Sequence, residues 1–100
     1  MRSGYKIQWS NRALKDLDKI IEYLKTEWGD ATFGEFVRKL EKRLALISIR
    51  PTLYAQLHYS RATRKSVLVR RLTIYYRIQG NTVFIVALFD NRQNPKKAPK

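Results

Sequence analysis

The sequence predicts an α+β fold, with an N-terminal strand followed by an antiparallel helical hairpin packed on one face of a small, twisted, mainly antiparallel sheet. Three observations lead to this prediction. The chain begins with an alternating apolar and polar segment, continues with two amphipathic helical segments, and carries three β-rich segments in its second half. One hundred residues can enclose one hydrophobic core but not two. We therefore expect one domain over residues 1–100, with residues 90–100 as a basic tail.

The first two elements differ in the period of their apolar residues. Tyr5–Trp9 alternates apolar and polar side chains, as a half-buried strand does. Ser10 and Asn11 are favourable at a helix start because their side chains accept backbone N–H groups. Apolar residues then recur at spacings of three and four, at Leu14, Leu17, Ile21, Leu24 and Trp28. This spacing predicts an amphipathic helix whose outer, mixed-charge face is solvated.

A short turn separates this helix from a second one. Gly29 is suited to a left-handed conformation that ends the first helix, and Asp30 can cap the second. Helical spacing resumes at Phe33 and continues to Ile47, and Pro51 ends the segment because its ring removes a backbone donor. Two helices joined by so short a turn must run antiparallel. Each still needs a surface to cover its apolar stripe.

The second half of the chain supplies that surface. Residues 52–63 have no clear period, and we expect an ordered loop there, packed by its own aromatic side chains. The segments Arg64–Val69, Leu72–Ile78 and Thr82–Phe89 are rich in β-branched and aromatic residues. Gly80–Asn81 is a tight-turn signal between the last two. These features predict a three-stranded meander.

Alternation along the middle strand places two sets of side chains on opposite faces of the sheet. The apolar set is Leu72, Ile74, Tyr76 and Ile78, and the mixed set is Thr73, Tyr75 and Arg77. The helices should cover the apolar set. The last segment is apolar on both faces from Val83 to Phe89, which suits a strand in the interior of the sheet.

Positive charge is concentrated in the second half of the chain. The 21 basic and 8 acidic residues give a formal net charge of +13. Residues 51–100 contain ten of the basic residues and one acidic residue, a net charge of +9. Such a positive pole attracts nucleic acid or an acidic protein without distinguishing the two, and plain solubility is the alternative explanation.

Most enzyme classes are excluded by what the sequence lacks. It has no cysteine and one histidine, His58, whereas general acid–base catalysis usually needs histidine or paired carboxylates in a pocket. It also lacks a zinc-ligand set, a glycine-rich phosphate loop and a nucleophile-elbow serine, so no metal or cofactor is predicted. No segment has the pattern of a signal peptide or a membrane span, and we expect a soluble, cytoplasmic protein.

The remaining candidates for function are strand-borne cations with aromatic neighbours. The predicted target-binding residues are Arg64, Lys65, Arg70, Arg71, Tyr75, Arg77 and Arg92, with Tyr59 and Tyr76 nearby in sequence. Arginine binds phosphates bidentately and tyrosine stacks on unpaired bases, so the set suits nucleic acid. For any one of these residues the alternative is structural, with Tyr76 in the core and the arginines keeping an edge strand soluble.

Four segments that together cover most of the chain resemble a known family. They are WSNRALKDLDKIIEYLKTEWG, EFVRKLEKRLALISIRP, TIYYRIQGNTVFIVALFD and NRQNP. In this order they resemble the RelE/ParE superfamily, the toxins of bacterial type II toxin–antitoxin systems. The resemblance implies a growth-arresting toxin, associated with plasmid stabilization, that acts on the ribosome or on DNA gyrase and is held harmless by an antitoxin wrapped around it.

Individual positions distinguish the branches of this superfamily. RelE-like mRNA endonucleases carry lysines on the second strand, an arginine at the start of the third, another arginine after the fourth, and a tyrosine in the tail. Arg64, with Lys65 beside it, stands at the first lysine position, and Arg92 at the arginine after the last strand. Ser66 and Thr73 stand at the second lysine and the third-strand arginine, and the tail has no tyrosine. The nuclease set is therefore incomplete.

The long hairpin with EWG at its turn resembles ParE more closely, and ParE-like toxins inhibit gyrase without being enzymes. Two alternatives stay open. One is a RelE-like ribosome-dependent mRNA endonuclease, with Arg64, Lys65 and Arg92 as catalytic residues and Arg70, Arg71 or Tyr75 substituting for missing groups. The other is a non-toxic basic nucleic-acid-binding module. The implied partners are an acidic antitoxin, through which oligomers would form, and gyrase, or the ribosome and mRNA under the nuclease alternative.

Overall fold

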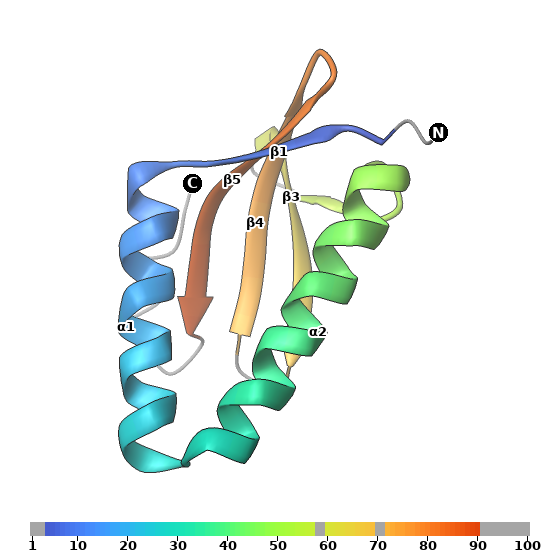
Figure 1. Cartoon of the computed structure of the whole chain (residues 1–100). Helices are drawn as coiled ribbons and strands as arrows, with labels where there is room; N and C mark the ends of the chain where they lie inside the picture. Colours follow the sequence, from blue (N-terminus) through green and yellow to red (C-terminus); the bar gives the residue numbers. More distant parts are fainter. Residues whose placement is uncertain (1–3, 58–59, 70–71, 91–100) are drawn as a thin grey trace.

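The computed structural model describes residues 4–57, 60–69 and 72–90, which form two helices on one face of a five-stranded sheet (Figure 1). In chain order the described elements are β1 (Lys6–Trp9), α1 (Asn11–Glu27), α2 (Asp30–Ile49), β2 (Gln56–Leu57), β3 (Ser60–Val69), β4 (Leu72–Gln79) and β5 (Thr82–Asp90). The helices run in opposite directions and diverge from the turn between them (Figure 1). Neither is long and apolar enough to cross a membrane. The predicted α+β fold with a helical hairpin is confirmed.

The sheet has the strand order β1-β5-β4-β3-β2. β1 pairs in parallel with β5, and the other three pairs are antiparallel. β1, at one edge of the sheet, therefore lies beside β5, and the helical hairpin connects β1 to β2 at the opposite edge. The predictions of a mainly antiparallel sheet, of a β3–β5 meander and of an interior position for the last strand are confirmed.

The prediction of a loop over residues 52–63 is wrong in its second part. Gln56 and Leu57 form β2, and β3 begins at Ser60. Gln56 pairs with Arg64, and its side-chain amide donates to the Arg61 carbonyl oxygen at 2.9 Å. A two-residue strand is too short to give an alternating pattern, so the sequence carries no periodic signal for it.

The turn between the helices differs from the prediction in its capping residue. Gly29 has the expected positive φ, at 86°, but it is the N-cap of α2, and Asp30 is the first residue of that helix. α2 therefore starts three residues before Phe33 and has no side-chain cap. The Asp30 carboxylate lies instead in the first turn, where it interacts favourably with the positive end of the helix dipole.

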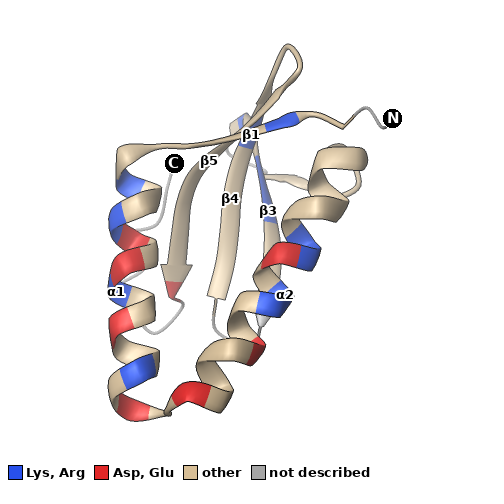
Figure 2. Ribbon diagram, in the orientation of Figure 1, with Lys and Arg blue, Asp and Glu red and all other residues tan. Residues whose placement is uncertain are grey.

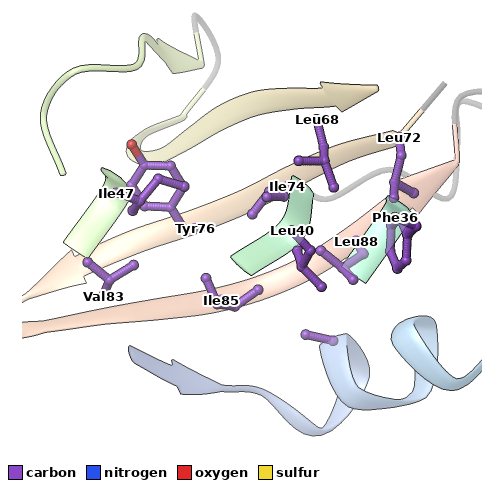
Figure 3. Close-up of a cluster of buried hydrophobic side chains, with 11 residues drawn as sticks. Phe36, Leu40, Ile47, Leu68, Leu72, Ile74, Tyr76, Val83, Ile85 and Leu88 are labelled. Atoms are coloured by element: carbon purple, nitrogen blue, oxygen red, sulfur yellow. The ribbon is translucent and has the colours of Figure 1, made fainter. Parts of the chain in front are cut away.

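The helices cover the apolar face of the sheet, as predicted (Figure 3). The buried residues of this core are Ala13, Phe36, Leu40, Ile47, Leu68, Leu72, Ile74, Tyr76, Val83, Ile85 and Leu88. On α1, Leu17, Ile20 and Leu24 pack against them. The predicted α1 stripe is therefore rotated by about one position, which leaves Leu14 and Trp28 exposed.

A β-bulge in β5 determines which of its apolar side chains face the helices. Tyr75 pairs with Ala87, whereas the next residue of β4 pairs with Ile85, so Val86 is an extra residue. The insertion reverses the alternation along β5. Leu88, and not its neighbour Ala87, therefore faces the helices together with Ile85.

Two polar side chains of the α1 region fix the hairpin to this bulge. The Ser10 hydroxyl accepts the Ala13 N–H at 2.9 Å, which confirms it as the N-cap, and donates to the Val86 carbonyl oxygen at 2.7 Å. The Asp16 carboxylate accepts the Leu88 N–H at 3.1 Å. These bonds satisfy backbone groups of β5 beyond the end of β1.

Candidate target-binding site

The predicted site residues lie on opposite faces of the sheet. The structure describes four of them, Arg64, Lys65, Tyr75 and Arg77, and the remaining three, Arg70, Arg71 and Arg92, lie outside the described residues, as do His58 and Tyr59. Side chains alternate along β3 and β4, and Leu68 and Tyr76 face the helices. Arg64 therefore also faces the helices, whereas Lys65, Tyr75 and Arg77 face away from them.

Arg64 binds backbone atoms of its own chain. Its Nη1 donates to the Tyr54 carbonyl oxygen at 2.6 Å and lies 3.4 Å from the Thr52 carbonyl oxygen. The side chain is half-buried, and Arg64 stands directly opposite Tyr76 in the register of β3 and β4. A guanidinium in this arrangement holds the segment between α2 and β2 against the sheet.

Tyr76 is fully buried and completes this arrangement from the neighbouring strand. Its hydroxyl donates to the Pro51 carbonyl oxygen at 2.7 Å. Burial raises the pKa of the Tyr76 phenol, and the nearby positive charge of Arg64 opposes part of that increase. The structural interpretation of Tyr76 as a core residue is confirmed.

Arg43 on α2 is a third member of this group, and it was not among the residues predicted from the sequence. Its Nη1 donates to Ser66 Oγ at 2.6 Å and to the Val67 carbonyl oxygen at 2.7 Å, and its guanidinium lies over the Tyr54 ring at 5.4 Å. The signal was present in the sequence, because Arg43 follows Leu40 by three residues and so lies on the inner stripe of the helix. We call Arg43, Arg64 and Tyr76 the loop clamp.

The other side of the sheet carries what we call the open sheet face. Its described residues on β3, β4 and β5 include Thr63, Lys65, Val67, Thr73, Tyr75, Arg77, Ala87 and Phe89. Lys65 is exposed, and the half-buried Arg77 donates through Nε to Thr63 Oγ1 at 3.1 Å. Tyr75 is only 7% exposed and packs edge-on against Phe89, with ring centroids 6.4 Å apart. Its ring supports the face and offers little area for stacking on a base.

Charge separates the helices from the sheet. Acidic residues lie on both helices, and within the strands the described acid is Asp90, at the end of β5 (Figure 2). No acidic residue occurs in the sequence between Glu41 and Asp90. Within the described ranges no cluster of His, Asp or Glu could hold a metal ion. The open sheet face thus carries the cations Lys65 and Arg77, an arrangement that suits binding of a negatively charged surface.

A known family matches most of the chain. The family model described as the ParE toxin of the type II toxin–antitoxin system parDE matches residues 7–95. The chain belongs to the ParE toxin family. It is therefore a toxin of a type II toxin–antitoxin system within the RelE/ParE superfamily, which favours a toxin over the non-toxic nucleic-acid-binding module. A search of curated protein sequences gives no match.

Solved structures share the fold of this ParE toxin at low sequence identity. A chain of the chromosomal ParDE system from P. aeruginosa has a TM-score of 0.72 and 15% identity, covering 89% of this chain and 98% of that one. The RelBE2 complex from Mycobacterium tuberculosis gives 0.61 and 18%, covering 87% and 98%. The E. coli DinJ–YafQ complex gives 0.58 and 15%, covering 89% and 94%. Because the identities are this low, these likenesses establish the fold alone.

Ser66 and Thr73, which stand where the resemblance implies cations in RelE-like nucleases, are both buried in this ParE toxin. Ser66 is 1% exposed and accepts the Arg43 bond, on the helix side of β3. Thr73 is 3% exposed and belongs to the open sheet face. Neither is a cation, and the two lie on opposite faces.

Proposed function

We propose that this toxin inhibits DNA gyrase by binding, without catalysing a reaction. The observation that supports this most directly is the placement of Arg64. It stands at the first cationic position of the RelE-like set, yet its guanidinium faces the helices and binds the Tyr54 carbonyl oxygen. Lys65, Tyr75 and Arg77 are on the other face of the sheet. Arg64 is thus turned away from the residues with which it would have to act.

Cleavage of RNA would require more than the described residues supply. Charge develops on the scissile phosphate in the transition state, and preorganised donors must converge on it to stabilise that charge. Ser66 and Thr73 replace two cationic groups, and the tail has no tyrosine. Removing one such donor commonly costs about 3–4 kcal/mol of transition-state stabilisation. Three missing groups favour a binding role.

The proposed target-binding surface is the open sheet face. Lys65 and Arg77 supply cations on neighbouring strands, and Tyr75 and Phe89 form the packed layer that fixes their backbone. We include Arg70, Arg71 and Arg92, which lie outside the described residues, because in the sequence they directly follow β3, directly precede β4 and closely follow β5. Binding through such a surface depends on complementary charge on the target.

We also infer that an acidic antitoxin neutralises the toxin in the cytoplasm and mediates its oligomerisation. The similar structures from P. aeruginosa, M. tuberculosis and E. coli are described as toxin–antitoxin systems or complexes. The net charge of +13, concentrated in the sheet half, favours a partner of opposite charge. Producing the chain alone should stop bacterial growth, and co-producing the protein of the neighbouring reading frame should restore it. Normal growth at verified soluble expression would refute the toxic activity.

A RelE-like endonuclease is the second candidate, favoured by the fold shared with RelBE2 and by Lys65 beside the first lysine position. The test is to map mRNA ends on translating ribosomes after brief induction of the toxin. Codon-linked cleavage that disappears with Lys65→Ala or Arg92→Ala would support the nuclease. Intact mRNA during growth arrest supports the gyrase proposal.

A further inference from the structure

We propose that the end of the open sheet face near the turn between β4 and β5 binds a single-stranded nucleic acid, with a base stacked on Phe84 and phosphates held by Arg77 and Lys6. A contribution of this contact to gyrase inhibition rests on the proposed function, whereas binding of the strand itself does not depend on it.

Phe84 is an aromatic residue on the open sheet face. Its neighbours in β5, Val83 and Ile85, are fully buried against the helices, so alternation directs Phe84 to the opposite face. Phe84 is half-buried, and it belongs to neither buried apolar cluster of the described residues. Tyr75, by contrast, is 7% exposed and packs against Phe89. Phe84 therefore offers the ring area for stacking that Tyr75 lacks.

Polar side chains lie on both sides of Phe84. Its direct partners in the register of the sheet are Gln8 of β1 and Arg77 of β4. Adjacent strands lie about 5 Å apart, so an amide and a guanidinium flank the ring. Lys6, two residues before Gln8, lies on the same face opposite Thr82, and both Lys6 and Gln8 are exposed. We call Lys6, Gln8, Arg77 and Phe84 the aromatic platform.

Backbone hydrogen bonds fix β1 to β5 on either side of Gln8. The Lys6 N–H donates to the Asn81 carbonyl oxygen at 2.8 Å, and the Ser10 N–H donates to the Ile85 carbonyl oxygen at 3.0 Å. The short β1 is thus bonded to its neighbour at both ends. A bound strand therefore meets a surface that needs little rearrangement.

Arg77 is preorganised to bind a phosphate. Its Nε donates to Thr63 Oγ1 at 3.1 Å, and Thr63 is fully buried. Within the described part of the chain this is the one hydrogen bond of the Arg77 side chain, so the edge formed by Nη1 and Nη2 is available. That edge can donate to two oxygens of one phosphate, and the bond to Thr63 reduces the side-chain entropy lost on binding.

The composition of the aromatic platform favours a nucleic acid over an acidic protein. The core of a protein interface is mainly apolar, whereas the ring of Phe84 lies between an amide and cations. A base offers a π face to the ring and polar edges to the amide of Gln8. β1, β3 and β4 contain no acidic residue, so they present no carboxylate that would repel phosphates.

The position of the ring favours a single strand over a duplex. Each base inside a duplex is covered by its neighbours, so Phe84 can stack on an unpaired base only. The major groove of a duplex admits a helix or a two-stranded ribbon. Phe84 lies instead on the middle one of three paired strands, β1, β5 and β4.

The experiment measures binding of the full-length chain to fluorescent oligothymidylate of about ten nucleotides by fluorescence anisotropy, without gyrase. An abasic deoxyribose-phosphate chain of the same length is the matched ligand, because it carries the same charge without bases. Oligothymidylate should bind about tenfold more tightly than the abasic chain. NMR should show shifts of the Phe84 ring resonances with oligothymidylate and not with the abasic chain.

Variants of Phe84 test the stacking contact. Phe84→Leu keeps an apolar side chain but removes the ring, so it should weaken oligothymidylate binding by about tenfold and leave abasic-chain binding unchanged. Phe84→Tyr keeps the ring and should bind like the unmodified chain. Circular dichroism of each variant verifies the fold.

Variants of the cations test the phosphate contacts. Each phosphate contact of a single strand contributes about 0.7 to the slope of log K against log salt concentration. Lys6→Gln should therefore lower this slope by about 0.7, whereas Lys19→Gln, at an exposed position of α1, should leave it unchanged. Arg77→Lys keeps the charge but loses the bidentate edge, so it should weaken binding by about threefold or more at an unchanged slope.

Equal affinity for oligothymidylate and the abasic chain would overturn the proposal, and this comparison holds even if Phe84→Leu fails to fold. Two other results would also overturn it. One is tighter binding of a duplex than of its separate strands, and the other is an oligoglutamate of equal charge that binds as tightly and shifts the same resonances. Because gyrase is absent from every measurement, gyrase inhibition and strand binding fail separately.

Discussion

Arg64 and Tyr76 lie directly opposite each other on β3 and β4, and both side chains donate to carbonyl oxygens of the segment between α2 and β2. This segment links the end of the hairpin to the edge of the sheet. Within the described residues the Pro51 and Tyr54 carbonyl oxygens accept no backbone N–H, so these two side chains supply their donors. The pair therefore connects the helical layer to the sheet, and a residue selected as a candidate for function has a structural role.

Arg64→Ala should destabilise the toxin, because it leaves the Tyr54 carbonyl oxygen without its charged donor. The expected loss is about 1–3 kcal/mol in the free energy of unfolding, measured by chemical denaturation. Lys65→Ala is the matched control, since it removes a neighbouring cation that is exposed. It should leave the unfolding midpoint unchanged and weaken growth arrest. If Arg64→Ala abolished toxicity at unchanged stability, Arg64 would have to be a target-binding residue.

Tyr76→Phe should change how stability depends on pH. Burial raises the pKa of the folded-state phenol above its ordinary value of 10.0, so folding favours the protonated form. The stabilisation from this group is complete below pH 10, the unfolded-state value, and falls as pH rises through the folded-state pKa. The unmodified chain should therefore lose stability above about pH 10 more steeply than Tyr76→Phe. Parallel stability curves for the two proteins between neutral and strongly alkaline pH would contradict this.

Gly29 and Gly34 should respond to alanine with opposite signs. Gly29 has φ 86° and ψ 178°, a region that side chains other than glycine rarely adopt, so Gly29→Ala should cost about 1–3 kcal/mol. Gly34 lies inside α2, where an added Cβ would meet its nearest neighbour, Arg38 Nη1, at 3.6 Å. Gly34→Ala should stabilise by about 0.5–1 kcal/mol. Thermal unfolding of both variants checks the pair, and stabilisation by Gly29→Ala would show that the turn is not as described.

Ser10→Ala should weaken the contact between α1 and the bulge of β5. It removes both the N-cap bond to Ala13 and the bond to the Val86 carbonyl oxygen, at an expected cost of about 1–3 kcal/mol. Thr26→Ala, at an exposed position of α1, is the control. Hydrogen exchange in Ser10→Ala should accelerate mainly in α1 and β5. Uniform acceleration over the whole sheet would mean that the bulge is not a local anchor.

The periodic spacing of apolar residues predicts the longer helices and strands, because their contacts with the core repeat along the sequence. Both helices, the meander and the interior position of β5 follow from patterns that extend over several turns or residues. β2 and the Val86 bulge could not be predicted this way, because each depends on one or two residues and on a partner strand distant in sequence. Arg43 is charged, so the apolar periodicity of α2 does not mark it, although its spacing of three from Leu40 places it on the same stripe.

The arrangement of the candidate site residues follows from the sequence only in part. Arg64 and Lys65 are both cations, but adjacent residues of a strand point to opposite faces, so alternation along β3 already separates them. The hydrogen-bond partners of Arg64, by contrast, cannot be predicted from the sequence. Its acceptors belong to a loop that has no periodic pattern, and only the tertiary fold brings them close to Arg64.

Inhibition of gyrase by binding is tested most directly by a supercoiling assay with purified gyrase, relaxed plasmid, ATP and increasing amounts of the full-length toxin. We expect supercoiling to decrease with toxin concentration or cleaved DNA to accumulate on gyrase. Lys65→Glu should weaken the effect while remaining folded, and the same toxin preparation should leave mRNA intact on translating ribosomes. Full supercoiling at toxin concentrations that arrest growth, together with codon-linked mRNA cleavage, would contradict gyrase inhibition and identify the toxin as a nuclease.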